Sequence, residues 1–427
     1  MTTIWVFLGS LLASMGIGMP IAFALLVSGL ALMWQLSVFD PNILAESMIN
    51  GADSFSLLAV PFFMLAGELM SSGGMSRRIV NLAMALFGHL PGGIGYVAIG
   101  AAVLMASLSG SAVADSAALA VILIPMMRDA GYDIPRACGL MSAGGIIAPV
   151  IPPSIGLIIF GVAANVSITK LFLAGIAPGI LMGVSLVGAW WWLVRKGAMP
   201  TRPRSSRLVL RRSFLEALPA LAMPVLIVGG LRLGIFTPTE AAVVAAVYAL
   251  LVGLFVYKEL SLRELYPLFL RAAKTSASVM FLVAAAFVSA WLVTIANIPT
   301  MLMHVLQPIA HDPTLLMFAI VGIVLMVGTA LDFTPSILIL TPVLMPVVQQ
   351  AGIDPVYFGV LFVIANALGL LTPPVGVVLN VVCSVAGIRM EEVVRGVWPF
   401  LLAQFLVLIL LVIFPSLVLY PLSLMTN

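Results

Sequence analysis

Residues 107–115 read Ser-Leu-Ser-Gly-Ser-Ala-Val-Ala-Asp and place a short polar segment between two apolar arms, 92–107 and 112–127. Each arm is about 16 residues long, which gives roughly 24 Å of α-helix at about 1.5 Å per residue. A helix needs about 20 residues to cross a bilayer core of about 30 Å. Because both arms are too short to cross comfortably, the pattern predicts a re-entrant helical hairpin (92–127) that enters and leaves the membrane on one side.

A broken helix is expected directly after this hairpin. Residues 137–168 are apolar, but Gly144-Gly145 and Pro149-Val-Ile-Pro-Pro-Ser154 interrupt them. Each proline removes a backbone donor and clashes with the preceding turn, so an unbroken helix cannot pass through this stretch. Non-helical backbone at membrane depth is tolerated only where protein or a water-filled cavity satisfies its polar groups. A hairpin beside a broken helix therefore indicates a solute site within the membrane.

The composition identifies the protein class. Of the 427 residues, 63% are hydrophobic and 8% are charged, against roughly 25% charged residues in soluble domains. We therefore expect an all-α polytopic membrane protein. Residues 195–212 are polar and contain several Arg and Lys residues but no acid. Because basic loops are typical of the cytoplasmic side, we interpret 195–212 as a cytoplasmic basic linker.

The second half of the chain repeats the first at a shift of about 221 residues. His89-Leu-Pro91 aligns with His311-Asp-Pro313, and Ile151-Pro-Pro153 aligns with Thr372-Pro-Pro374. Several matches at nearly one shift indicate an internal repeat. We therefore divide the chain into a first repeat at 1–194, the linker, and a second repeat at 213–427 with a hairpin at 313–349 and a broken helix at 355–386.

The charge distribution predicts that the two repeats are inverted. Arg77, Arg78, Arg128 and Arg136 flank the open end of the first hairpin, whereas the corresponding stretches of the second repeat lack Lys and Arg. By the positive-inside rule, the first hairpin opens to the cytoplasm and the second to the opposite side. Inverted repeats of this kind underlie alternating access, with the solute bound near the midplane.

Polar residues gather at both hairpin tips and both breaks, where an ionisable side chain costs on the order of 2.5–3.5 kcal/mol by insertion scales. Unwound backbone carbonyls together with side-chain oxygens suit Na⁺, so the pattern predicts two sodium sites. The alternative is that these side chains only cap half-helices and hold the hairpins together. The candidates are Ser107, Ser109, Ser111, Asp115 and Pro149 in the first half, and Thr329, Asp332, Thr334, Asn366 and Thr372 in the second.

Other functions fit the sequence less well. Ser107-Leu-Ser-Gly110 is not the Gly-x-Ser-Gly of intramembrane serine proteases, and we expect no histidine at membrane depth to act as a base. A Walker A motif is absent, so an ion gradient is the expected driving force. We therefore favour an ion-coupled carrier over a channel or a membrane enzyme. Glu68 and Glu240 are candidate proton carriers, although Glu240 is better explained as part of a helix first turn.

The sequence resembles the large membrane subunit of the tripartite ATP-independent periplasmic (TRAP) transporters. The motifs that carry this likeness are spread over most of the chain. They are Gly16-Ile-Gly-Met-Pro-Ile-Ala-Phe-Ala24, Ser107-Leu-Ser-Gly-Ser-Ala-Val-Ala-Asp115, Ala148-Pro-Val-Ile-Pro-Pro-Ser154, Leu338-Ile-Leu-Thr-Pro-Val-Leu-Met-Pro346 and Leu370-Leu-Thr-Pro-Pro-Val-Gly376.

The resemblance implies an elevator-type fold similar to that of sodium/dicarboxylate symporters, in which a hairpin-bearing domain slides against a fixed scaffold. Residues 92–194 and 313–420 would supply most of the moving domain, and 79–90 and 298–310 would be its connecting arms. Na⁺ would be the coupling ion, with no organic cofactor.

The resemblance also implies partners and a location. The partners would be a separate four-helix small membrane subunit and a soluble periplasmic substrate-binding protein, with no nucleic acid. The chain itself would lie in the lipid bilayer of a bacterial inner membrane. Substrates of the family are organic acids, namely C4-dicarboxylates, keto acids, sialic acid and sugar acids. Our candidates for substrate contact are Ser154, Asn165 and Asn380. The alternative is a stand-alone ion-coupled dicarboxylate symporter.

Overall fold

The computed structural model describes residues 2–195, 201, 203–309, 311–373 and 375–426. In these residues the secondary structure consists of helices joined by turns and loops, without strands. Pro374 and part of the predicted linker, including Lys196 and Arg202, lie outside the described residues. Within the described part of the chain, 8 helices are long and apolar enough to cross a membrane. The prediction of an all-α polytopic membrane protein is confirmed.

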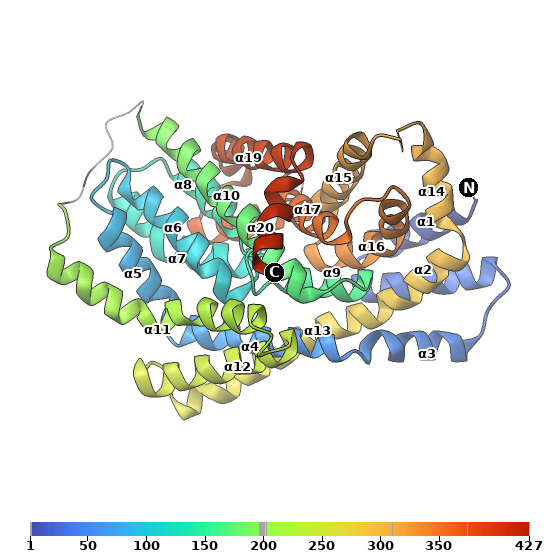
Figure 1. The fold of residues 1–427 in the computed structure, drawn as a ribbon, viewed down its shortest axis with the longest axis horizontal. Coiled ribbons are helices and arrows are strands. Elements are labelled where there is room, and N and C mark those ends of the chain that lie inside the picture. Colours follow the sequence, from blue (N-terminus) through green and yellow to red (C-terminus); the bar gives the residue numbers. More distant parts are fainter. Residues whose placement is uncertain (1, 196–200, 202, 310, 374, 427) are drawn as a thin grey trace.

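Two segments of the chain form a scaffold group along the lower edge and right of Figure 1. The long helix α13 contacts α2, α3 and α4, and α4 packs against α12. The scaffold group consists of α1 (Thr2–Gly16), α2 (Ile21–Gln35), α3 (Pro41–Ala52), η1 (Phe55–Leu58), α4 (Ala59–Ser72), α11 (Arg207–Arg232), α12 (Pro238–Leu251), η2 (Val252–Val256) and α13 (Leu262–Ile295).

Most of the remaining helices form a hairpin group above the scaffold in Figure 1. Short helices, which we call the arms, precede each hairpin: α5 (Met75–Phe87), and α14 (Ile298–Leu306) followed by η3 (Gln307–Ile309). The hairpin group consists of α6 (Gly93–Ser109), α7 (Ala112–Asp129), α8 (Ile134–Gly145), α9 (Ile155–Ala164), α10 (Ile168–Val194), α15 (Pro313–Ala330), α16 (Phe333–Gln350), α17 (Pro355–Gly369), α18 (Val377–Ala386), α19 (Met390–Ile413) and α20 (Ser416–Thr426).

The first hairpin turns at a single glycine. Gly110 ends α6 with a left-handed φ of 63°, a conformation that costs glycine nothing. Ser111 then caps α7, because its Oγ accepts the N–H of Ala114 at 3.4 Å. The broken helix follows as α8 and α9, with residues 146–154 non-helical between them.

The second hairpin has the same design with a different cap. Asp332 caps α16, and its Oδ1 accepts the N–H of Phe333 at 2.7 Å. By length and composition α15 and α16 each qualify as candidate spans, yet 18 residues give only about 27 Å of helix. The pair is joined at Leu331-Asp332 and its tip packs on α17, so we describe it as a hairpin. A hairpin beside a broken helix in each half is confirmed.

The two repeats interlock through their broken helices. The half-helix α9 of the first repeat packs on the hairpin helix α16 of the second, and α18 of the second packs on α7 of the first. At one such contact the ring of Phe333 lies where a side chain on Gly156 would stand. At the other, Arg128 donates to the carbonyl of Ala386 at 2.7 Å. The hairpin group is therefore one packed body.

The predicted linker is partly helical. Helix α11 begins at Arg207, inside the stretch 195–212, because the Oγ of Ser206 accepts the N–H of Val209 at 3.3 Å and so caps it. An N-cap serine satisfies one of the free donors of the first turn. The basic residues Arg207, Arg211 and Arg212 consequently lie on a helix and not in a loop.

Helices α8 and α19 touch backbone to backbone. A Cβ added at Gly139 would lie 2.7 Å from the Cα of Val397, and one added at Gly396 would overlap the carbonyl oxygen of Pro135. Small residues allow close approach of this kind between membrane helices. Glycine at these positions is thus required by packing.

We expect Gly396→Ala to destabilise the protein by about 1–3 kcal/mol, because its methyl group would overpack a backbone contact. The measurement is the thermal midpoint of the detergent-solubilised protein. The matched control is Gly188→Ala in α10, where the added Cβ meets nothing within 4 Å. Equal midpoints for the two variants would contradict the close contact between α8 and α19.

Candidate functional site

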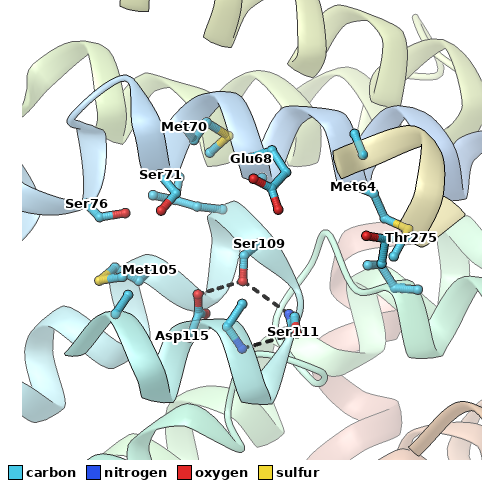
Figure 2. A pocket seen from close by; sticks show the side chains of 16 residues that line it. Met64, Glu68, Met70, Ser71, Ser76, Met105, Ser109, Ser111, Asp115 and Thr275 are labelled. Atoms are coloured by element: carbon cyan, nitrogen blue, oxygen red, sulfur yellow. Dashed lines mark hydrogen bonds between the residues drawn. The ribbon is translucent and has the colours of Figure 1, made fainter. Parts of the chain in front are cut away.

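The first hairpin tip holds a small hydrogen-bond network. The Oγ of Ser109 donates to Asp115 Oδ1 at 2.6 Å and accepts the N–H of Ser111 at 3.2 Å. Figure 2 shows these three residues facing one another at the tip. The serines of the sequence motif therefore hold the turn in shape and fix the orientation of the Asp115 carboxyl group.

Asp115 is buried but incompletely satisfied. Only 3% of the residue is exposed, and its second oxygen, Oδ2, has no hydrogen-bond partner in the protein. Burying a carboxylate without a full set of partners is costly, although its place in the first turn of α7 is favoured by the helix dipole. The protein therefore leaves Oδ2 of Asp115 unsatisfied.

A cavity of about 200 Å³ lies between this tip and the scaffold group, beside the contact of Ser109 with Gly67. Glu68 extends into it from α4, opposite Ser109, in Figure 2, and Arg271 of α13 donates to Glu68 at 3.4 Å. In the described part of the chain, no three His, Cys, Asp or Glu side chains group around a metal position. A cation at this tip would therefore rest on hydroxyl and backbone oxygens beside Asp115.

The first break lies directly against the tip. A Cβ on Gly110 would stand 2.5 Å from the carbonyl oxygen of Pro153 and 3.2 Å from the Cα of Ser154. Ser154 is fully buried. Its hydroxyl donates to the carbonyl of Pro149 and accepts the N–H of Leu157 at 3.1 Å. The structure thus brings Ser154 to the tip, and Pro149 accepts the hydrogen bond of its hydroxyl.

Asn366 joins the second tip to the second broken helix. Its Nδ2 donates to the carbonyl of Phe333 at 2.8 Å, while its Oδ1 is buried without a partner. A Cβ on Gly328 would lie 2.8 Å from that oxygen. Both tips therefore present one buried side-chain oxygen that lacks a hydrogen bond in the protein.

The other second-half candidates bond to nearby backbone. Thr329 donates to the carbonyl of Met326 at 2.7 Å, and Thr372 to that of Leu368 at 2.8 Å. Asp332 is exposed and caps α16, and Thr334 is half-buried in the first turn of that helix. Ser107 of the first half likewise donates to the carbonyl of Leu104 at 2.7 Å. These contacts agree with the alternative that such side chains only cap half-helices and hold the hairpins together. A second sodium site stays a prediction.

The three substrate candidates do not lie together. Asn165 is exposed at the far end of α9 from Ser154, in a left-handed conformation with φ of 54°; a helix of 10 residues spans about 15 Å. Asn380 is exposed and donates to the carbonyl of Val375 at 2.7 Å, across the second break. Of the three, Ser154 alone is beside the first tip.

Sequence reasoning missed several buried polar groups. Ser116, Ser142 and Thr341 each carry a buried hydroxyl without a partner, and Gln404 has an unpaired Oε1. Their isolated polarity in apolar helices was the available signal. Among the residues that were considered, Glu240 forms a capping box with Thr237, which confirms its place in a helix first turn.

A family model and known proteins match this chain. The model for the DctM component of the tripartite ATP-independent periplasmic transporters covers residues 8–417. The 2,3-diketo-L-gulonate TRAP transporter large permease protein of Escherichia coli (strain K12) is 54% identical over 418 residues, covering 98% of each chain. The sialic acid TRAP transporter large permease protein of Vibrio cholerae is 40% identical over 411 residues, covering 96% of each.

One solved structure supports the fold. The crystal structure of the Alcanivorax borkumensis YdaH transporter matches with a TM-score of 0.65 at 14% identity, over 89% of this chain and 88% of that one. At this identity the likeness concerns the fold alone.

We expect Gly110→Ala to destabilise the protein more than Gly131→Ala. Both glycines have a left-handed φ, 63° and 77°, so each substitution costs about 1–2 kcal/mol in backbone strain. Only at Gly110 does the new methyl group also meet the first break, whereas at Gly131 it meets nothing within 4 Å. The overlap adds about 1–3 kcal/mol. Thermal midpoints in detergent measure the difference, and identical midpoints would show that tip and break do not touch.

Proposed function

This chain belongs to the DctM component of the tripartite ATP-independent periplasmic transporters, and on that premise we propose that it imports an organic acid with Na⁺ as the coupling ion. It is a large permease subunit, a multi-pass protein of the bacterial inner membrane. The relatives compared above are transporter permeases and not enzymes.

The observation that carries sodium coupling is the unpaired Oδ2 of Asp115. Asp115 lines the cavity, and its buried Oδ2, which lacks a protein partner, would be stabilised by a cation. The serine hydroxyls at 109 and 111 and the non-helical backbone at 149–154 supply further oxygens nearby. Carriers commonly bind Na⁺ with unwound backbone of this kind. The buried Oδ1 of Asn366 is the corresponding group at the second tip.

The substrate that we propose is a hydroxylated organic acid. The named substrates of the two relatives, 2,3-diketo-L-gulonate and sialic acid, both combine a carboxylate with several hydroxyl groups. Half-helix α9 begins beside the first tip, and Ile155 in its first turn lines the cavity there. A helix N-terminus attracts anions through its free N–H groups. The substrate carboxylate would therefore approach the start of α9, close to the cation at Asp115.

The movement that we propose is an elevator. The hairpin group is one interlocked body, and it would slide against the scaffold group and carry cation and substrate across the membrane. The arms α5 and α14 would connect the two groups. A small membrane subunit would hold the scaffold in place, and a periplasmic substrate-binding protein would deliver the organic acid. With inverted repeats, the first hairpin would open to the cytoplasm and the second to the periplasm.

We expect Asp115→Asn to weaken the apparent sodium affinity of uptake by about 10- to 100-fold, since a charge-assisted contact is worth about 1.5–3 kcal/mol. The measurement is uptake of radiolabelled 2,3-diketo-L-gulonate and sialic acid into proteoliposomes. These contain the chain, its small subunit and its binding protein, and uptake is titrated with Na⁺. The matched control is Asp133→Asn, because Asp133 is an exposed aspartate that precedes α8.

Imposed gradients separate sodium coupling from its alternatives. A sodium gradient should drive uptake, whereas potassium and proton gradients should not. Uptake that a proton gradient drives equally well without sodium would contradict the proposal and direct attention to Glu68.

We expect cysteines at positions 67 and 109 to cross-link and to arrest transport. A Cβ on Gly67 of α4 lies 3.7 Å from the Cβ of Ser109, within the range that a disulfide requires. Gly67 belongs to the scaffold group and Ser109 to the hairpin group, so the bond would prevent sliding. Uptake by Gly67→Cys/Ser109→Cys is measured before and after reduction, with each single variant as the baseline. Unchanged uptake by a fully cross-linked protein would exclude an elevator.

A further inference from the structure

A second, larger cavity lies beside the hairpin helix α6. It has a volume of about 970 Å³ and lies between arm α5, hairpin helix α6 and the spanning helix α10. Its walls are almost entirely apolar and include Phe87, Val103, Val184 and Val187. We call this cavity the lateral groove. Its apolar lining and its open side make it suited to hydrocarbon and not to a polar substrate.

One end of the lateral groove carries a positive charge. Among the described residues that line the groove, Arg195 is the one charged side chain. Its guanidinium lies 4.8 Å from the ring centre of Trp191, which also lines the groove. This cation–π contact holds the guanidinium at one end of the lateral groove.

The position of the charged end is that of a membrane surface. Helix α10 is a candidate span that ends at Val194, immediately before Arg195. Tryptophans such as Trp191 and Trp192 at a helix end are typical of the interface between lipid and water. An anionic group at this end would therefore meet the guanidinium of Arg195.

The groove is long enough to extend through one leaflet. Ile180 and Arg195 both line it, and the stretch of α10 between them extends about 22 Å. Half of a hydrocarbon core is about 15 Å thick. A chain that starts at Arg195 can therefore lie along the groove from the interface to the bilayer midplane.

We propose that the lateral groove binds one anionic phospholipid, with its phosphate at Arg195 and an acyl chain against Val184 and Val187. Basic pockets between membrane helices on the cytoplasmic side select anionic headgroups in this way. Residues of the arm α5, the hairpin helix α6 and α10 all line the groove, so the lipid would contact both the arm and the hairpin that it precedes. The inference needs only that the chain lies in a bilayer and is independent of sodium coupling.

Native mass spectrometry of the detergent-purified full chain tests this site. Dioleoyl-phosphatidylglycerol and dioleoyl-phosphatidylcholine carry the same acyl chains and differ in headgroup charge. We expect phosphatidylglycerol to bind more tightly, and Arg195→Gln to weaken it by about five-fold, since one basic residue near the surface contributes roughly that factor. Arg195→Lys should retain binding. The matched control Arg232→Gln, at the end of α11 and outside the groove, should leave binding unchanged.

A second pair of measurements tests the groove itself. Val187→Trp should fill the groove and reduce phosphatidylglycerol binding, and a photoactivatable phosphatidylglycerol should label peptides of α6 and α10 in the unsubstituted protein. Equal binding of the two lipids, or an equal effect of Arg195→Gln and Arg232→Gln, would overturn the proposal. So would a cysteine at position 187 that cross-links to the small subunit in the assembled complex, because the groove would then be a protein interface.

Discussion

The arrangement of the hairpins and broken helices depends on one constraint. Backbone N–H and C=O groups at membrane depth need hydrogen-bond partners that lipid cannot supply. This chain interrupts its helices at Gly110, at 146–154, at 331–332 and at 370–373 with 375–376. The two tips are packed against the broken helices of their own repeats, Gly110 on Pro153 and Gly328 on Gly369. In each repeat the hairpin tip and the break of the broken helix therefore lie against each other.

This constraint also explains the packing of the hairpin group. An isolated hairpin with a non-helical tip would not be stable in lipid, so each one needs a neighbour that stays with it. The exchange of half-helices between repeats, α9 on α16 and α18 on α7, supplies that neighbour. The two repeats therefore pack together as one body.

The two tips are related in sequence but differ in charge placement. At the repeat shift of about 221 residues, Ser111 corresponds to Asp332, and both are N-caps. Asp115 corresponds to Ser336, a buried residue whose hydroxyl donates to the carbonyl of Asp332 at 2.9 Å. The two aspartates are therefore not equivalent: Asp332 is an exposed cap, and Asp115 is a buried carboxyl group beside a cavity. The aspartate of the first tip is therefore buried, whereas that of the second tip is exposed.

The sequence by itself determined the class of the protein, its hairpins and its broken helices. Arm length, proline and glycine decide these features locally, because a short apolar arm cannot cross a bilayer and a helix cannot pass through Pro149, Pro152 and Pro153. The sequence also identified the polar tips, but it could not distinguish Asp115 from Asp332, or place Asn165 away from Ser154. Burial and unpaired oxygens are properties of what surrounds a side chain. Those surroundings come from α4, α13 and the opposite repeat, which are distant along the chain, so only the tertiary structure decided which polar residue faces the cavity.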